Sequence, residues 1–162
     1  MNEIIELMRT AAKAGTRLLE PDVPAIRTDG VYVIFTAIDD TVAAVRVADD
    51  LAKAMTVPLT LVHFRNVPFQ LPVDAPDGIS PVETDAFVAR LQAEGFDVRV
   101  RVYLCREERR TISLAFRRHS LVVLAGRRRW WPTLAERWRR WLESAGHFVV
   151  FVDLEDKEQF RA

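Results

Sequence analysis

The sequence is poor in the residues that form disulfides and metal sites. Among 162 residues there is one cysteine, Cys105, and the three histidines stand far apart, at positions 63, 119 and 147. One cysteine cannot form an internal disulfide, and histidines this scattered lack the spacing of a zinc site. We therefore expect a fold without disulfides and without a bound metal.

Long apolar runs and a basic leader are also lacking. No apolar stretch approaches the ~18 residues that cross a membrane, and Glu3 and Glu6 stand where a secretory signal would be basic. We expect a cytoplasmic protein without stable membrane insertion. Apolar residues make up 49% and charged residues 28% of the chain, which is typical of one ordinary folded domain at this length.

Charge is balanced overall but unevenly distributed. Between Arg106 and Arg140 there are eleven arginines and three acidic residues, an excess of eight positive charges that the rest of the neutral chain must offset. Such asymmetry attracts an anionic partner, or it lets two parts of one fold or dimer attract each other. We favour the second interpretation.

Five segments predict strands. Apolar runs rich in β-branched residues at 31–38, 59–64, 121–125 and 148–152 predict buried strands, and residues 98–104 alternate apolar side chains with Arg99, Arg101 and Tyr103, as an edge strand does. Segments with the apolar spacing of a helix lie between the predicted strands, from Asp40 or Thr41 to Met55 and at 80–95, 107–118 and 132–146.

This alternation predicts an α/β fold, a doubly wound five-stranded parallel sheet in the order 3-2-1-4-5. We assign it to residues 29–155. Residues 1–28 would hold an amphipathic helix, at 3–19, and a linker, and residues 156–162 a tail. Ligands of such sheets bind beyond the carboxyl ends of the strands, where the strand order reverses.

The sequences and order of the predicted strands resemble those of the universal stress protein family over residues 30–153. The resemblance rests on residues 31–38, on Leu-Thr-Leu-Val-His-Phe at 59–64, on Leu-Val-Val-Leu-Ala-Gly at 121–126 and on the last strand. It implies a regulatory or binding domain that some members use to bind ATP. It also implies a homodimer through the last strand, whose residues here are Phe148, Val149, Val150, Phe151 and Val152.

The sequence departs from the ATP-binding signature of that family. Of the glycines expected after the fourth strand only Gly126 is present, Arg129 stands at the second glycine position, and Thr36 aligns with the aspartate of the first strand. Glycines there let backbone N–H groups approach phosphates. We therefore expect no cofactor, and ATP binding by the usual route is disfavoured.

The candidate ligand site comprises six residues at the carboxyl ends of the strands: Thr36, Asp39, Gly126, Arg127, Arg128 and Arg129. The arginines would hold a small anion or a nucleotide through guanidinium hydrogen bonds, or they form a solvated loop or a protein contact. Asp39 and Asp40 fit a magnesium or phosphoryl site less well than two acidic residues at a helix start.

Three further sets of residues invite a functional interpretation that we weigh against a structural one. Cys105, near several arginines, is a redox-sensitive thiol or, as we prefer, a buried inert one. His63 is expected to pack. The tryptophans and arginines of 130–141 resemble a membrane or nucleic-acid surface, but the stripe of Leu134, Trp138, Trp141 and Leu142 is needed to cover the sheet, so neither partner is expected.

The sequence thus predicts a non-catalytic regulatory or binding domain. Two alternatives stay open: an ATP- or AMP-binding protein with a degenerate phosphate loop, and a cytoplasmic sensor domain that works with a membrane transporter or a kinase. The N-terminal helix would pack on the domain or on a protein partner, and the sensor-domain alternative gives it a docking role.

Overall fold

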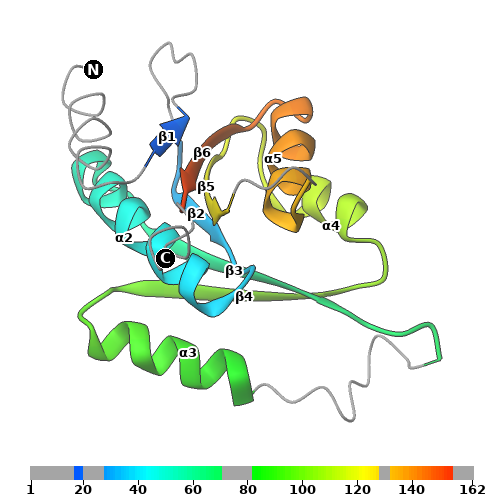
Figure 1. The fold of residues 1–162 in the computed structure, drawn as a ribbon, viewed down its shortest axis with the longest axis horizontal. Helices are drawn as coiled ribbons and strands as arrows, with labels where there is room; N and C mark the ends of the chain where they lie inside the picture. The colour runs from blue at the N-terminus through cyan, green and yellow to red at the C-terminus, as the bar shows by residue number, and fades with distance from the viewer. Residues whose placement is uncertain (1–16, 20–27, 71–81, 128–131, 155–162) are drawn as a thin grey trace, which may run out of the picture.

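A computed structural model describes residues 17–19, 28–70, 82–127 and 132–154, in which strands and helices alternate (Figure 1). The strands are β1 (Arg17–Leu19), β2 (Val31–Ile34), β3 (Leu59–Asn66), β4 (Val98–Cys105), β5 (Leu121–Gly126) and β6 (Phe148–Asp153). The helices are α2 (Ile38–Met55), α3 (Val82–Ala93), α4 (Glu108–Ala115) and α5 (Leu134–Ser144).

The sheet has the order β1-β6-β5-β2-β3-β4, and its five strands from β2 to β6 are mutually parallel. Counted from β2, these strands have the order 3-2-1-4-5, which confirms the predicted doubly wound α/β fold. The order reverses between β2 and β5, so the carboxyl ends of these two strands mark the expected ligand position.

A sixth strand was not predicted. Residues Arg17–Leu19 were expected at the end of an amphipathic helix, but they form β1, which pairs antiparallel with β6 from Asp153 to Phe151. An exposed edge strand offers unpaired backbone groups, and β1 satisfies part of them. The remainder of the predicted helix lies outside the described residues. A homodimer through β6 stays a prediction, and β1 already occupies that edge at residues 151–153.

Two hydrophobic layers cover the two faces of the sheet. On one face, Val31 and Val33 of β2 join the cluster that includes α2 and α3, and on the other face Tyr32 and Ile34 join the cluster that includes α4 and α5. Because both faces of β2 are covered, all four of its residues are buried, as a parallel strand in the centre of such a sheet requires.

The connection from β2 to α2 lies earlier in the chain than predicted. The strand ends at Ile34 rather than at residue 38, and α2 begins at Ile38, ahead of the expected start at Asp40 or Thr41. The Thr41 hydroxyl donates to the Ala37 carbonyl at 2.6 Å, which fixes the first turn from inside the helix. Asp39 and Asp40 therefore lie in the first turn, where the helix dipole favours acidic residues.

The other helices are each shorter than the pattern indicated. Helix α4 ends at Ala115 instead of residue 118, and α5 covers Leu134–Ser144 within the predicted 132–146. The Thr133 side chain caps α5 by accepting a hydrogen bond from the Glu136 backbone N–H at 3.3 Å. Such a cap satisfies a donor that the first turn leaves unpaired.

Candidate functional site

The predicted site lies where the strand order reverses. Thr36 follows β2, Asp39 lies in the first turn of α2, and Gly126 and Arg127 end β5 and follow it. Strand β2 pairs with β5, so the fold brings these two connections to the same end of the sheet. Arg128 and Arg129 lie outside the described residues.

Gly126 has a packing reason to be glycine. A Cβ at this position would lie 2.9 Å from the Ala135 Cβ and 3.3 Å from the Phe151 ring, both of them buried. The Gly126 carbonyl accepts a hydrogen bond from the Leu154 N–H at 3.0 Å. The absent side chain thus allows α5 and β6 to approach the end of β5.

Arg127 lies close to the acidic start of α2. Burial raises the pKa of the Asp40 carboxyl above its ordinary value, the charge of Arg127 opposes this, and the neighbouring Asp39 adds to it. Arg127 therefore acts on a carboxylate of its own chain. An anion bound beside Arg127 would also approach two acidic side chains, which reduces the net attraction.

Thr36 does not offer its backbone donor to a ligand. Its N–H donates to the Thr41 hydroxyl at 3.2 Å, within the tight turn before α2. The Thr36 hydroxyl is buried without a hydrogen-bond partner, a state that usually costs free energy and that a water molecule or a polar ligand would relieve. A hydroxyl can both donate and accept, so the Thr36 side chain has hydrogen-bonding capacity left for such a group.

A polar cluster beside this site was not predicted as one. His63 Nδ1 lies 2.9 Å from the Thr84 hydroxyl, and the Arg65 guanidinium donates to the same hydroxyl at 3.3 Å. The His63 ring also packs against Phe35, with 4.6 Å between centroids. His63 therefore packs, as expected. The signal in the sequence was its spacing of two from Arg65, which places both side chains on one face of β3.

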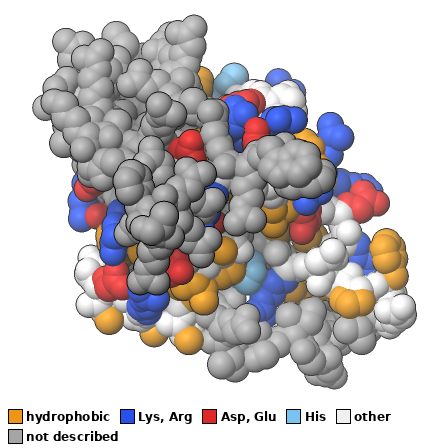
Figure 2. Space-filling model, in the orientation of Figure 1, with side chains coloured by type: hydrophobic (Ala, Val, Ile, Leu, Met, Phe, Trp, Pro, Cys, Tyr) orange, Lys and Arg blue, Asp and Glu red, His pale blue; other side chains and the backbone are white. Residues whose placement is uncertain are grey.

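The basic helix α5 is neutralised largely by its own acidic residues. Arg139 pairs with Glu143, and Arg140 pairs with Glu136, each at 3.1 Å. Figure 2 shows red acidic side chains among the blue basic ones over the α4 and α5 region. The mixed surface differs from the uniform basic face that nucleic acid or an anionic membrane attracts.

The predicted core stripe of α5 is confirmed at two of its positions. Trp138 and Leu142 are buried, and Trp141 is half-buried, with the Arg109 guanidinium 5.8 Å from its ring centre. Leu134 is 40% exposed, so its assignment to the core was wrong. As the first residue of the helix, it lies at the end of the stripe.

Cys105 is buried at the end of β4, as preferred on sequence grounds. Its thiol lies 3.6 Å from the Arg65 carbonyl, the geometry of a weak hydrogen bond. Burial raises the pKa of the thiol above its ordinary value, with a smaller opposing effect of the Thr111 hydroxyl. A raised pKa lowers the thiolate fraction, which is the reactive form.

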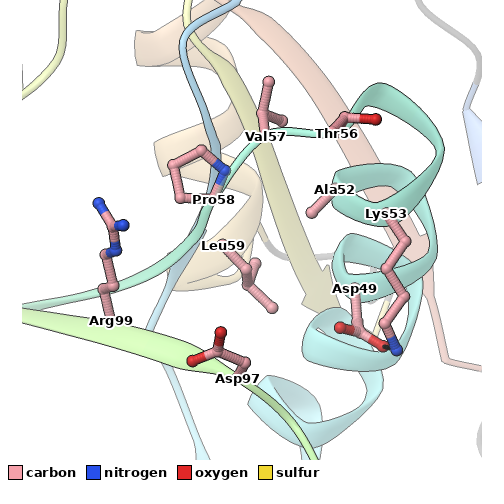
Figure 3. Close-up of a pocket in the computed structure, with 9 residues that line it drawn as sticks. All are labelled: Asp49, Ala52, Lys53, Thr56, Val57, Pro58, Leu59, Asp97 and Arg99. Atoms are coloured by element: carbon pink, nitrogen blue, oxygen red, sulfur yellow. Dashed lines mark hydrogen bonds and ion pairs between the residues drawn. The ribbon is translucent and has the colours of Figure 1, made fainter.

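A pocket of about 450 Å³ lies at the opposite end of the sheet from the predicted site (Figure 3). It is lined by the end of α2, the connection to β3 and the start of β4: Asp49, Ala52, Lys53, Thr56, Val57, Pro58, Leu59, Asp97 and Arg99. Lys53 pairs with the largely buried Asp49. No sequence motif marked this pocket, because it is built from element ends that only the fold brings together.

Across residues 17–19, 28–70, 82–127 and 132–154, no group of three or more histidine, cysteine or acidic side chains is arranged to hold a metal ion. Within the same part of the chain, no helix has both the length and the apolar character to cross a membrane.

The fold defines a doubly wound α/β domain whose strand order reverses between β2 and β5. No family model matches the sequence, and no curated protein does. A solved universal stress protein from Archaeoglobus fulgidus superposes with a TM-score of 0.55, covering 79% of this chain and 95% of its own, at 17% identity. This chain therefore has the universal stress protein fold.

A second solved structure, from the universal stress protein family of Burkholderia pseudomallei, covers 81% of this chain and all of its own. Its identity is 19% and its TM-score 0.47.

Proposed function

We propose that this chain is a non-catalytic regulatory or binding domain of the universal stress protein class that does not bind ATP through a glycine-rich loop. The observation that carries the proposal is the environment of Gly126. Its missing side chain is required by Ala135 and Phe151, so the glycine is explained without a phosphate ligand. The one residue that matches the signature thus supports packing rather than nucleotide binding.

Electrostatics supports the same proposal. A triphosphate at the carboxyl ends of β2 and β5 would approach Asp39 and Asp40 in the first turn of α2. Arg127 offsets part of this repulsion, but it already acts on Asp40. The Thr36 N–H, which could otherwise face a ligand, is bonded to Thr41. The usual backbone and helix-terminus contacts to phosphate are correspondingly weak here.

Native mass spectrometry of freshly purified protein, followed by calorimetric titration with ATP and AMP, tests the proposal. We expect no retained nucleotide and a Kd for ATP weaker than about 1 mM, or about −4 kcal/mol of binding free energy. The double variant Asp39→Asn and Asp40→Asn is the informative companion, because removing the acidic residues should strengthen any residual affinity. One ATP retained per chain would refute the proposal and favour the degenerate-loop alternative.

Inorganic phosphate is the second probe. If the arginine run holds a small anion, phosphate will raise the melting temperature, and Arg128→Ala with Arg129→Ala will abolish that rise. A cytoplasmic location and a homodimer through β6 are further parts of the proposal. Sedimentation of the full chain measures the subunit number.

A further inference from the structure

The strand β4 forms an edge of the sheet. It pairs in parallel with β3 from Leu59 and Val98 to Asn66 and Cys105, and it stands last in the strand order. In Figure 1 it lies at the boundary of the sheet, with α3 alongside. The opposite edge is formed by β1, the short strand that pairs with β6. A long edge strand presents backbone N–H and C=O groups with which another strand can pair.

The middle of β4 is open on both faces. Four consecutive residues, 99–102, are exposed, with Val100 36% and Val102 46% accessible. Side chains of a strand alternate between its two faces, so a run of exposed residues requires that neither face be covered there. By contrast, every residue of β5 is buried. Helices α3 and α4 therefore leave the central part of this edge accessible.

The two open faces differ in chemistry. Arg99 and Arg101 share one face, and Val100 and Val102 share the other. Among the described residues, neither side chain forms a hydrogen bond or a close ion pair, although Arg101 acts on the Tyr32 hydroxyl and Arg99 lines the pocket that also holds Asp97. The edge thus combines backbone groups available for pairing, an exposed positive face and an exposed apolar face.

We propose that this edge binds an extended segment of a partner protein in which acidic residues alternate with apolar ones. Directly opposed residues of paired strands have their side chains on the same face. Acidic side chains of the segment would therefore lie opposite Arg99 and Arg101, and apolar ones opposite Val100 and Val102. Backbone pairing supplies affinity and the alternating side chains supply selectivity, the mode known as strand addition.

A second copy of β4 is a poorer occupant. Antiparallel pairing of two identical strands about a two-fold axis keeps each face opposite itself, so the arginine face of one copy would meet that of the other. Like charges directly opposed across strands are destabilising. The same arginines that would select an acidic segment therefore oppose self-association through β4.

Fluorescence anisotropy with a labelled peptide tests the proposal on the full chain. The probe is a capped peptide with three Glu-Val repeats, and the comparison peptide has Lys-Val repeats. We expect the chain to bind the Glu-Val peptide at least about tenfold more tightly, since two cross-strand charge pairs distinguish the peptides. The variant Arg99→Glu with Arg101→Glu should reverse that order.

A matched control variant, Arg118→Glu with Arg137→Glu, changes the net charge equally at two exposed positions, one in the turn before β5 and one on α5. It should retain the parent selectivity. A pair of Glu-Val peptides N-methylated at odd or at even residues tests backbone pairing. One of the two should lose binding, because only one set of N–H groups faces β4.

Three results would overturn the proposal: no binding of the Glu-Val peptide, equal effects of the two double variants, or equal binding of both methylated peptides. The last two would indicate general charge attraction rather than strand addition. The test is independent of the nucleotide titration, because β4 contributes nothing to the connection after β5 or to the start of α2. Amide exchange of the variants confirms that β4 is retained.

Discussion

Replacing Gly126 with alanine tests whether this glycine serves packing or a ligand. The new Cβ would lie 2.9 Å from the Ala135 Cβ, whereas carbon atoms in favourable contact lie about 3.5–4.0 Å apart. Both atoms are close to the backbone and cannot rotate away, so β5 and α5 must separate. Such overpacking costs about 1–3 kcal/mol, and the gain from replacing a strand glycine offsets about 0.5–1 kcal/mol.

We therefore expect Gly126→Ala to lower the free energy of unfolding by roughly 1–2 kcal/mol, or Tm by about 3–6 °C in a domain of this size. Urea unfolding followed by circular dichroism, without ligand, measures the change. A double-mutant cycle with Ala135→Gly identifies its source. Ala135→Gly alone should cost about 1 kcal/mol of helix propensity, and the two changes together should cost less than their sum.

A role in phosphate binding makes a different prediction for the same substitution. If Gly126 is required only for close approach of a ligand, Gly126→Ala will leave the stability of the unliganded protein unchanged or raise it. That outcome, or strict additivity with Ala135→Gly, would refute the packing account and weaken the proposed absence of ATP binding.

Three other predictions follow from buried or capping groups. Burial, and to a lesser extent the charge of His119, lowers the pKa of His147. As pH falls below about 6.5, the unfolded chain therefore binds more protons than the folded chain, and the free energy of unfolding should decrease by up to about 1.4 kcal/mol per pH unit. The variant His147→Gln should show a weaker pH dependence, which urea titrations at pH 7.5 and 5.5 measure. An equal pH dependence of stability in the parent and the variant would contradict this prediction. Iodoacetamide at neutral pH should label the buried Cys105 thiol far more slowly in the native than in the unfolded protein, and rapid native labelling would revive a redox role. Thr133→Ala should cost about 1 kcal/mol of stability through loss of the cap on the Glu136 N–H, whereas Thr133→Ser should cost little.

The sequence predicted the sheet well because its strands carry strong local signals. Val31 and Val33 face one layer and Tyr32 and Ile34 the other, so the strand is apolar throughout, and this was visible in the sequence. The end of β2 was not visible in the sequence. The apolar run continues to Ile38, but Thr41 bonds to the Thr36 N–H and stabilises a turn within that run. Side-chain bonds to the backbone compete with strand continuation and leave no mark in hydrophobic periodicity.

The strand β1 could not be predicted for a different reason. Its partner, β6, follows more than 130 residues later, from Asp153 to Phe151 opposite Arg17 to Leu19. Local spacing of apolar residues does not encode so distant a pairing, and in a three-residue segment helical and extended patterns are indistinguishable. The prediction of the candidate site from the sequence was limited in the same way. Gly126 was identified from its position after an apolar strand, but its contacts with Ala135 and Phe151 depend on how two later elements pack.

The distribution of arginines illustrates why charge density in a sequence differs from charge available to a partner. The densest basic segment, residues 106–140, is partly compensated: Arg139 and Arg140 pair with acidic residues one turn away, and Arg117 pairs with Asp29 at 3.3 Å. Arg99 and Arg101 lie outside that segment and are exposed on an edge strand. A pair of arginines can select a partner only where the fold leaves their guanidinium groups accessible beside backbone that can pair, and this combination favours β4 over the arginine-rich segment as the place to look for a recognised protein.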